Sequence, residues 1–181
     1  MDYGAKIIDQ VESLFKLISL LRFRRTDRVT FDMAPGSIFG KIGAIDKVVH
    51  APGAHSPGAV NGVARPWYMH PHQEDNLMVI NGHRVVQLYT PKHGKIEEFE
   101  VYPDRVIRNG ELICEGTTIL NFPCGVFHRI VSSDHDGSIS MNFAIHDDKF
   151  DLDDNFNIYD LNPDTGEYIM LRPGSKDHCY R

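Results

Sequence analysis

Hydrophobic residues follow two different patterns along this 181-residue chain. Between residues 5 and 21 they recur at spacings of three and four, which places them along one face of a helix. Asp2 precedes this stretch as a candidate N-cap, and the basic residues Arg22, Arg24 and Arg25 follow it, where positive charge favours a helix C-terminus. The pattern predicts an amphipathic N-terminal α-helix whose apolar face carries Ile7, Ile8, Val11, Leu14, Phe15, Ile18 and Leu21.

From Trp67 to about Leu171 the hydrophobic residues form short β-type runs separated by turn signals. Asn81-Gly82 and Arg108-Asn109-Gly110-Glu111 are typical of hairpin turns, and residues 157–161 and 167–171 indicate a last hairpin. Many short strands at close, even spacing are typical of a sandwich or a barrel. The strands expected before the last hairpin lie near residues 67–72, 76–81, 83–90, 96–101, 105–108, 111–114, 117–122, 126–132 and 137–145.

The length fits one domain of ordinary size, which can bury a sizeable core without disulfides. We expect a single domain over residues 1–181, divided into four parts. The N-terminal helix occupies 1–25, a loop-rich entry 26–64, the barrel core 65–146 and a C-terminal extension 147–181. The entry contains two Pro-Gly steps, which interrupt regular helix.

Composition narrows the class of protein. Hydrophobic residues make up 41% and charged residues 24%, as in soluble globular proteins, and the formal net charge is −6. This charge argues against a general nucleic-acid or membrane binder. No apolar run reaches the roughly 20 residues that span a bilayer, and no secretion signal is expected. Three cysteines without a C-x-x-C pair favour a reducing, cytoplasmic location.

The histidines supply the candidate chemistry. His70-Pro71-His72 lies at the end of a predicted strand, where residues i and i+2 point to the same face, and carboxylates follow at once. His128 comes after a Pro-x-Gly turn that returns the chain to a strand. Neutral imidazole is a common ligand of Fe, Zn, Ni and Cu, so this arrangement predicts a metal site.

The two motifs together resemble those of the cupin superfamily, RmlC-like β-barrels. His70, His72 and Gly82 match the first cupin motif, and the second is matched by Pro123, Gly125 and His128. The resemblance covers roughly residues 64–145 and implies an all-β, cupin-type double-stranded β-helix (jelly-roll) barrel. Ala64, Gly116 and Ser132 depart from the motif positions.

The position of the acidic ligand in the first motif depends on which end of the motif is used for counting. Counting back from Gly82 gives Asp75, whereas counting forward from His72 gives Asn76, a poorer ligand. We therefore expect Asp75 first, Glu74 next and Asn76 last. The resemblance then implies a metal held by His70, His72, Asp75 and His128, with Fe(II) expected first and Mn, Ni or Zn as alternatives.

The function implied by this resemblance is that of a metal-dependent enzyme. Such a site acts on a small organic acid or sugar by dioxygenase-, isomerase- or lyase-type chemistry. We expect no nucleic-acid or membrane partner. Similar cupins commonly form homodimers, and the N-terminal helix or the tail strands are candidate contacts.

Two alternatives remain open. The sequence also resembles metal-free nucleotide-sugar epimerases and isomerases, in which a histidine is the base and a tyrosine is the acid. Candidate acids are Tyr68, Tyr89 and Tyr159, although no basic patch for a diphosphate lies near the motifs. The second alternative is a non-catalytic cupin that binds a small molecule.

Three arginines near the motifs are candidate partners for an anionic substrate. Arg84, Arg105 and Arg129 all lie in predicted strands. Because arginines on strands are usually solvated, we expect these three at the surface.

Overall fold

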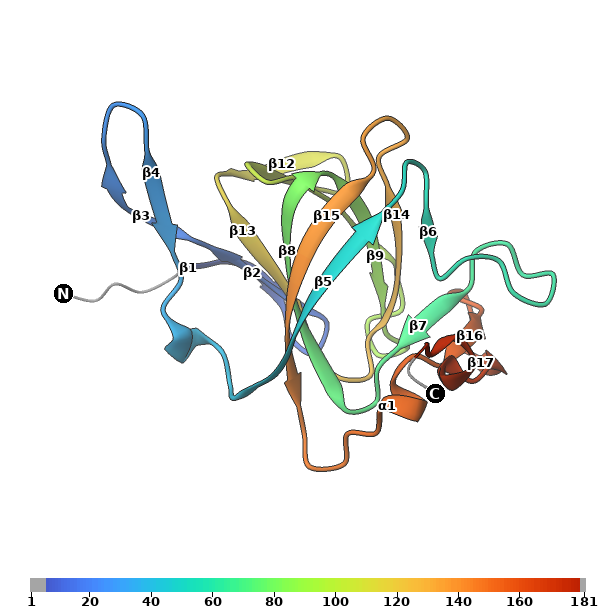
Figure 1. Cartoon of the computed structure of the whole chain (residues 1–181). Coiled ribbons are helices and arrows are strands. Elements are labelled where there is room, and N and C mark those ends of the chain that lie inside the picture. The colour runs from blue at the N-terminus through green and yellow to red at the C-terminus, as the bar shows by residue number, and fades with distance from the viewer. Residues whose placement is uncertain (1–5, 180–181) are drawn as a thin grey trace.

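A computed structural model describes residues 6–179, most of which form two large β-sheets that face each other (Figure 1). The first sheet has six strands in the order β1-β2-β13-β8-β15-β5. Their bounds, in that order, are Lys6–Val11, Phe15–Ser19, Thr118–Phe122, Gln73–Gly82, Ser138–His146 and Ile42–His50.

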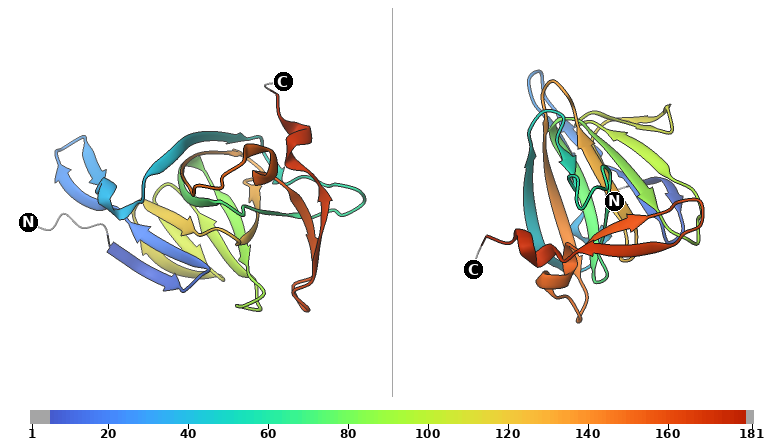
Figure 2. Two further views of the ribbon diagram at one scale, coloured as in Figure 1. Left: turned by 90° about the horizontal axis from the view of Figure 1, so that it is seen from below. Right: turned by 90° about the vertical axis from the view of Figure 1, so that its right-hand side faces the viewer.

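The second sheet has nine strands, in the order β12-β11-β10-β9-β14-β7-β16-β17, with β6 also paired to β14. Their bounds are Glu111–Glu115, Arg105–Arg108, Glu97–Val101, Arg84–Tyr89, Phe127–Ser132, Trp67–Met69, Ile158–Leu161 and Tyr168–Arg172, with β6 at His55–Ser56. The β1 and β17 strands lie on opposite sides of the barrel (Figure 2).

A few elements lie outside these sheets. Strands β3 (Leu21–Arg25) and β4 (Thr30–Met33) pair with each other and extend away from the barrel in Figure 1. Helix α1 is a single turn, Leu152–Asn155, and short 3-10 turns cover Gly36–Ile38 and Gly174–Asp177. In the described part of the chain, no helix has the length and hydropathy to cross a membrane.

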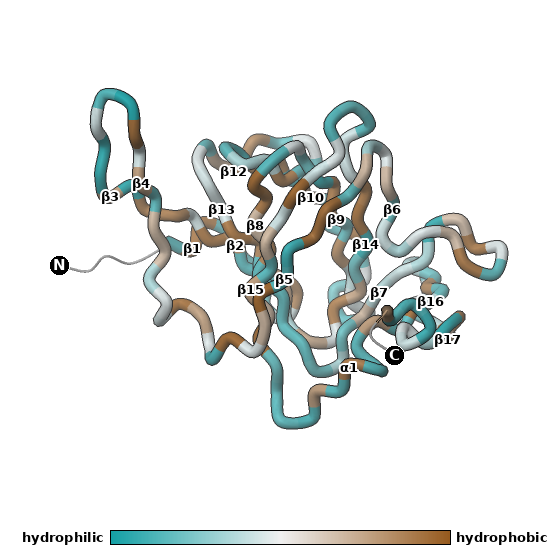
Figure 3. Tube along the Cα trace, in the orientation of Figure 1, coloured by the Kyte–Doolittle hydropathy of each residue, from teal (hydrophilic) through white to brown (hydrophobic). Residues whose placement is uncertain are grey.

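The hydrophobic core fills the space between the two sheets. Because successive side chains of a strand point to opposite faces, each strand contributes alternate residues to it. Phe15 and Phe99 pack edge to face, with ring centroids 4.8 Å apart. Figure 3 shows hydrophobic residues along the barrel strands and hydrophilic residues at the loop tips. The cluster includes Leu14, Phe15, Leu17, Leu77, Leu88, Phe99, Leu120 and Phe122.

The predicted N-terminal helix is wrong, because the stretch folds into the antiparallel strands β1 and β2. The chain reverses near Ser13, whose φ is 62°, and β2 then pairs with β13 of the barrel. The stretch is rich in β-branched and aromatic residues, which pack well on a pleated surface. Pairing with β13 therefore outweighs the helical spacing. The expected cap, Asp2, lies outside the described residues.

The two predicted turns have different outcomes. Arg108 pairs with Glu111 across a two-residue turn in which Asn109 and Gly110 have φ of 50° and 83°, so this hairpin is confirmed. The Asn81-Gly82 hairpin is wrong, because β8 belongs to the first sheet and β9 to the second. Gly82, at φ 66°, turns the chain from one sheet to the other.

The barrel also extends beyond residues 65–146. The nine-residue strand β5 lies within the expected loop-rich entry and pairs with β15 at the edge of the first sheet. The C-terminal hairpin, β16 and β17, is confirmed and continues the second sheet through β7. Both additions matter because β5 and the C-terminal segment contribute residues to the candidate site.

Candidate functional site

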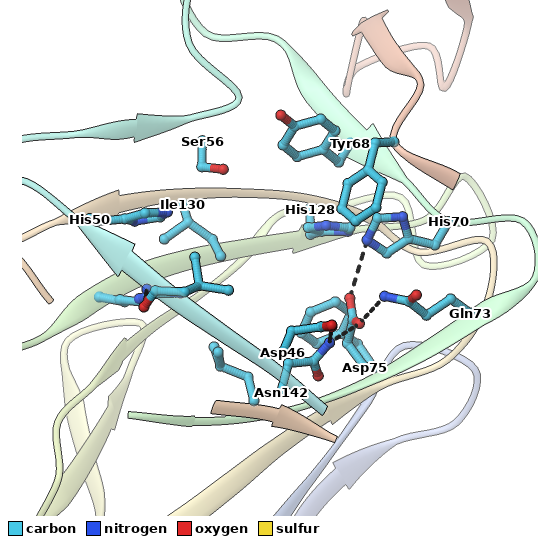
Figure 4. A pocket seen from close by; sticks show the side chains of 15 residues that line it. Asp46, His50, Ser56, Tyr68, His70, Gln73, Asp75, His128, Ile130 and Asn142 are labelled. Atoms are coloured by element: carbon cyan, nitrogen blue, oxygen red, sulfur yellow. Dashed lines mark hydrogen bonds and ion pairs between the residues drawn. The ribbon is translucent and has the colours of Figure 1, made fainter. Parts of the chain in front are cut away.

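A cavity of about 150 Å³ lies inside the barrel, with walls from both sheets. Figure 4 shows the side chains that line it. Strands β5, β8 and β15 supply residues from the first sheet, and β7, β9 and β14 supply residues from the second. A volume of this size admits about one six-membered ring.

Three of the four expected metal ligands meet at one end of this cavity. One ligand atom from each of His70, Asp75 and His128 lies within 4.8 Å of the others. Each of these residues is only 5% exposed. They come from the corner after β7, from β8 and from β14, so the two sequence motifs converge in space.

His72 lies outside this cluster. The expected strand over 67–72 ends at Met69, so His70 and His72 do not share a strand face. The imidazole of His72 contacts the Asp147 carboxylate instead, with 2.9 Å between Nδ1 and Oδ2. About a third of the His72 side chain is exposed.

Asp75 is the acidic residue of the motif that faces the cavity. Its neighbours Glu74 and Asn76 point to the other face of β8, as the alternation of a strand requires. There, Asn121 donates hydrogen bonds to both side chains, at 2.7 Å to Glu74 and 2.9 Å to Asn76. The expected order, with Asp75 first, therefore agrees with their placement.

The two oxygens of the Asp75 carboxylate have different surroundings. Oδ1 accepts hydrogen bonds from the Gln73 and Asn142 side-chain amides, both at 2.7 Å. Oδ2 faces Nε2 of His70 at 3.4 Å. The two amides thus fix the carboxylate so that Oδ2 points toward the imidazole (Figure 4).

His70 lies between two hydrogen-bond acceptors. Its Nδ1 donates to the backbone carbonyl of Asn155, and its Nε2 faces the Asp75 carboxylate. A backbone carbonyl only accepts, so the Nδ1 atom carries hydrogen. The Nε2 lone pair would then face a carboxylate oxygen, unless a proton or a metal cation lies between the two atoms.

His128 is the neutral histidine of the cluster. Burial, and secondarily the neighbouring His70, lower the pKa of His128 to about 4. Its Nδ1 donates to the Val126 carbonyl at 3.2 Å, which leaves the lone pair of the neutral ring on Nε2. The centroids of the His70 and His128 rings are 4.7 Å apart.

Of the three candidate tyrosines, Tyr68 lines the cavity. Its ring centroid lies 5.9 Å from that of His128 and 6.4 Å from that of His70. Burial raises the pKa of Tyr68, so its phenol stays protonated at neutral pH. Tyr89 instead donates to the Pro163 carbonyl, and Tyr159 packs edge to face on Phe127.

Three solved structures with a similar fold are a sugar isomerase, a sugar ketoisomerase and a sugar epimerase. A dTDP sugar isomerase from Desulfovibrio desulfuricans G20 is 14% identical, with a TM-score of 0.53 over 72% of this chain and 75% of that chain. The sugar 3,4-ketoisomerase QdtA from Thermoanaerobacterium thermosaccharolyticum, solved with TDP, is 14% identical, with a TM-score of 0.52 over 76% and 85%. The dTDP-4-dehydrorhamnose 3,5-epimerase from Sulfolobus tokodaii is 15% identical, with a TM-score of 0.52 over 81% and 78%.

The fold is that of the RmlC-like cupins. The likeness is structural, since no known family model and no curated protein matches the sequence. The cupin barrel expected from the two motifs is thereby confirmed, whereas the helix expected before it is not. The homodimer and the metal expected from the motifs stay predictions.

The candidate site includes residues that the two sequence motifs do not contain. Asn155, in α1, gives its backbone carbonyl to His70 and its side-chain amide to Gln73, at 2.9 Å. Gln73 in turn holds Asp75. Asp46 of β5 lines the same end of the cavity and accepts a hydrogen bond from Asn142 at 3.1 Å.

Sequence reasoning could have found one of these residues. Gln73 and Asp75 are two apart in a strand, so alternation predicts that they share a face. Asp46 is harder to find from the sequence, because its strand mixes polar and apolar residues on the inner face and shows no clear hydrophobic periodicity. In the structure, burial raises the pKa of Asp46. Asn155 follows an acidic, loop-like stretch whose pattern indicates only a solvated turn.

The three candidate arginines lie in different surroundings. Arg105 stacks on the exposed side of Tyr102, 3.7 Å from the ring centroid. Arg129 is half-buried and stacks on Trp67 at 4.1 Å. Arg84 is 1% exposed and lines the cavity, so the expectation that it is solvated is wrong.

Proposed function

We propose that this cupin is an enzyme of the isomerase or epimerase type, which moves a proton at a carbon next to a carbonyl group of a sugar-like substrate. The observation that carries this proposal is the placement of His128, whose Nδ1 donates to the Val126 carbonyl and whose ring lies in the cavity beside the His70–Asp75 pair. Burial lowers its pKa to about 4, so the ring is neutral and its Nε2 is a base. A neutral imidazole can act as a general base, and a neighbouring group that carries a proton can act as the acid. The three similar structures, two sugar isomerases and an epimerase, support the same reaction class.

In the proposed reaction, the His128 Nε2 atom takes a proton from the carbon beside the carbonyl. The electron pair of the broken C–H bond forms the double bond of an enediol, and the carbonyl oxygen takes a proton. In an isomerisation, His128 returns the proton to the former carbonyl carbon, and the other enediol hydroxyl loses its proton to form the new carbonyl. In an epimerisation, an acid on the opposite face protonates the original carbon, and the oxygen gives its proton back as the carbonyl re-forms. Atoms and electrons balance without an oxidant or reductant.

In this proposal, Tyr68 or His70 protonates the carbonyl oxygen. Tyr68 keeps its phenolic proton at neutral pH because burial raises its pKa. His70 is the second candidate, because its Nε2 faces the Asp75 carboxylate at 3.4 Å. Gln73 and Asn155 act as positioning residues. Gln73 donates a hydrogen bond to Asp75, and Asn155 donates to Gln73 and accepts from His70.

A metal-dependent enzyme is the second candidate, and the same three residues favour it. His70 and His128 each donate Nδ1–H to a backbone carbonyl, which is how metal-ligating histidines are commonly oriented. With Asp75 they offer two imidazoles and one carboxylate within 4.8 Å, a set that suits Fe(II) or another divalent ion. Such an ion supplies Lewis-acid chemistry, and the side chains hold it and shield it from water.

The test is proton exchange by the full-length protein after treatment with a chelator. The protein is incubated in D₂O with TDP-4-keto-6-deoxyglucose and with unactivated ketoses, and deuterium at carbon is measured by NMR. We expect exchange without metal, a loss of about 10²–10⁴-fold in His128→Asn, and a comparable loss in Tyr68→Phe. His135→Asn, at an exposed histidine, is the matched control.

The alternatives give different results. Exchange that returns only when Fe(II), Mn(II) or Zn(II) is added favours the metal-dependent enzyme. Absence of exchange with every keto sugar, with or without added metal, contradicts both candidates and leaves the non-catalytic binding protein.

A further inference from the structure

The cavity contains a buried positive charge that has no acidic partner. Arg84 begins β9, directly after Gly82 has turned the chain into the second sheet. Its guanidinium donates to the Ser138 hydroxyl at 2.9 Å and to the Val48 carbonyl at 3.1 Å. Both acceptors are neutral, and no carboxylate in residues 6–179 forms an ion pair with it.

Several other arginines of the described residues pair with carboxylates. Arg22 contacts Asp32, and Arg108 contacts both Asp9 and Glu97. The Arg22–Asp32 pair lies near the surface, where a charge costs little, and Arg108 compensates the charge of the buried Glu97. Arg84 is 1% exposed, and removing a charge from water is costly unless an opposite charge compensates it. Burial lowers the pKa of Arg84 to about 10, yet the group remains a cation at neutral pH.

A histidine nitrogen without a hydrogen-bond partner lies beside Arg84. His50 stands two residues after Val48 on β5, so both side chains point to the same face. The Nδ1 atom of His50 is buried and has no hydrogen-bond partner among the described residues. In Figure 4, His50 lies at the side of the cavity away from His70.

We propose that the Arg84–His50 end of the cavity binds an oxyanion of the substrate, so that the substrate is an acidic sugar. A carboxylate accepts two hydrogen bonds from one guanidinium and supplies the missing negative charge. One six-membered ring fills the roughly 150 Å³ cavity, so the acid group belongs to the ring unit itself. A phosphate on the sugar is the other source of the same oxyanion chemistry. This inference rests on the proposed function for the sugar-like ring.

The charge distribution also fixes the orientation of such a substrate. Asp75 and Asp46 lie at the opposite end from His50, where they repel an anion (Figure 4). The acid group therefore lies at Arg84, and the carbon that exchanges its proton lies beside His128. An enzyme for neutral sugars has no need of this buried cation.

The experiment measures binding by calorimetry, with the chelator-treated full-length protein. The probes are D-galacturonate, its neutral parent D-galactose, and D-galactose 6-phosphate. We expect at least one of the two anions to bind about tenfold or more tightly than galactose, and the preference to disappear in Arg84→Met. Preference for the uronate assigns a carboxylate, and preference for the phosphate ester assigns a phosphate.

Two further variants keep the result interpretable. Arg25→Met, at an exposed arginine of β3, is the matched control and should bind as the wild type does. His50→Gln should weaken anion binding several-fold without changing the binding of galactose. Circular dichroism of Arg84→Met is compared with that of the wild type to check that the variant is folded.

Two results overturn the inference. One is that neither anion binds better than galactose, and the other is that Arg84→Met binds the anion as the wild type does. Deuterium exchange into neutral keto sugars would then still support the proposed function. Conversely, anion binding that depends on Arg84, in a protein without exchange activity, supports the oxyanion site and contradicts the enzyme.

Discussion

Two buried charges on neighbouring strands have opposite surroundings. Glu97 of β10 is 0% exposed and Arg84 of β9 is 1% exposed, and the two strands pair with each other. The Glu97 carboxylate is surrounded by donors. Lys95 and Arg108 lie at 3.0 and 2.9 Å, and His93 and Asn109 donate at 2.8 and 2.7 Å.

The pKa of Glu97 reflects this difference. Burial alone would raise it, but the hydrogen bonds from the surrounding donors lower it to about 2. Arg84 has only a hydroxyl and a carbonyl as partners, and burial lowers its pKa. A buried charge that the chain itself compensates is part of the scaffold, whereas a buried charge in a cavity that the chain leaves uncompensated is available to a ligand.

Removing the Glu97 charge should have the largest effect. Glu97→Gln leaves Lys95 and Arg108 beside a neutral amide, and breaking a buried pair from one side costs about 3–5 kcal/mol. We expect the free energy of unfolding in urea to fall by that amount. Glu111→Gln, on the exposed strand β12, is the control and should change it by less than about 0.5 kcal/mol. Equal effects of the two substitutions would contradict the comparison.

Removing the Arg84 charge should have a much smaller effect on stability. In Arg84→Met, the loss of two hydrogen bonds to neutral acceptors is offset by removal of a buried, unpaired cation. We expect the free energy of unfolding of the ligand-free protein to change by about 1 kcal/mol or less. A loss as large as that of Glu97→Gln would mean that Arg84 serves the scaffold.

At neutral pH the smallest effect comes from His50, whose contribution appears only in acid. Burial, and secondarily Arg84, lower the pKa of His50 to about 4 from an ordinary value of 6.5. Between pH 6.5 and 4, His50 is therefore protonated in the unfolded chain and neutral in the folded protein. The free energy of unfolding falls as the pH drops through this range. Urea unfolding across this range should show a shallower fall in His50→Gln. Identical pH profiles would contradict the assignment.

The sequence predicts the centre of the barrel well and its periphery poorly. Two short motifs bring His70, Asp75 and His128 together, because each lies where a strand and a tight turn restrict the backbone. The N-terminal stretch has helical spacing, but its Phe15 and Ile18 pack against a sheet that only the folded chain provides. Local periodicity contains no information about that pairing partner.

The remaining errors have a similar cause. His72 leaves the cluster because β7 ends one residue before His70, and a strand boundary is the feature that a local pattern predicts least well. Arg84 looks like a surface arginine on an alternating strand until Gly82 is seen to pass the chain between sheets. Alternation along β9 places Arg84 on the same face as the buried Val86 and Leu88.

The protonation of His128 tests the central claim most directly. In the chelator-treated protein labelled with ¹⁵N-histidine, two-bond ¹⁵N–¹H correlations distinguish the two ring nitrogens. The account predicts that at pH 7 the Nδ1 of His128 carries the proton, that Nε2 is free, and that the ring titrates near pH 4. A His128 ring that is protonated on Nε2, or that is a cation at pH 7, would contradict its role as the base.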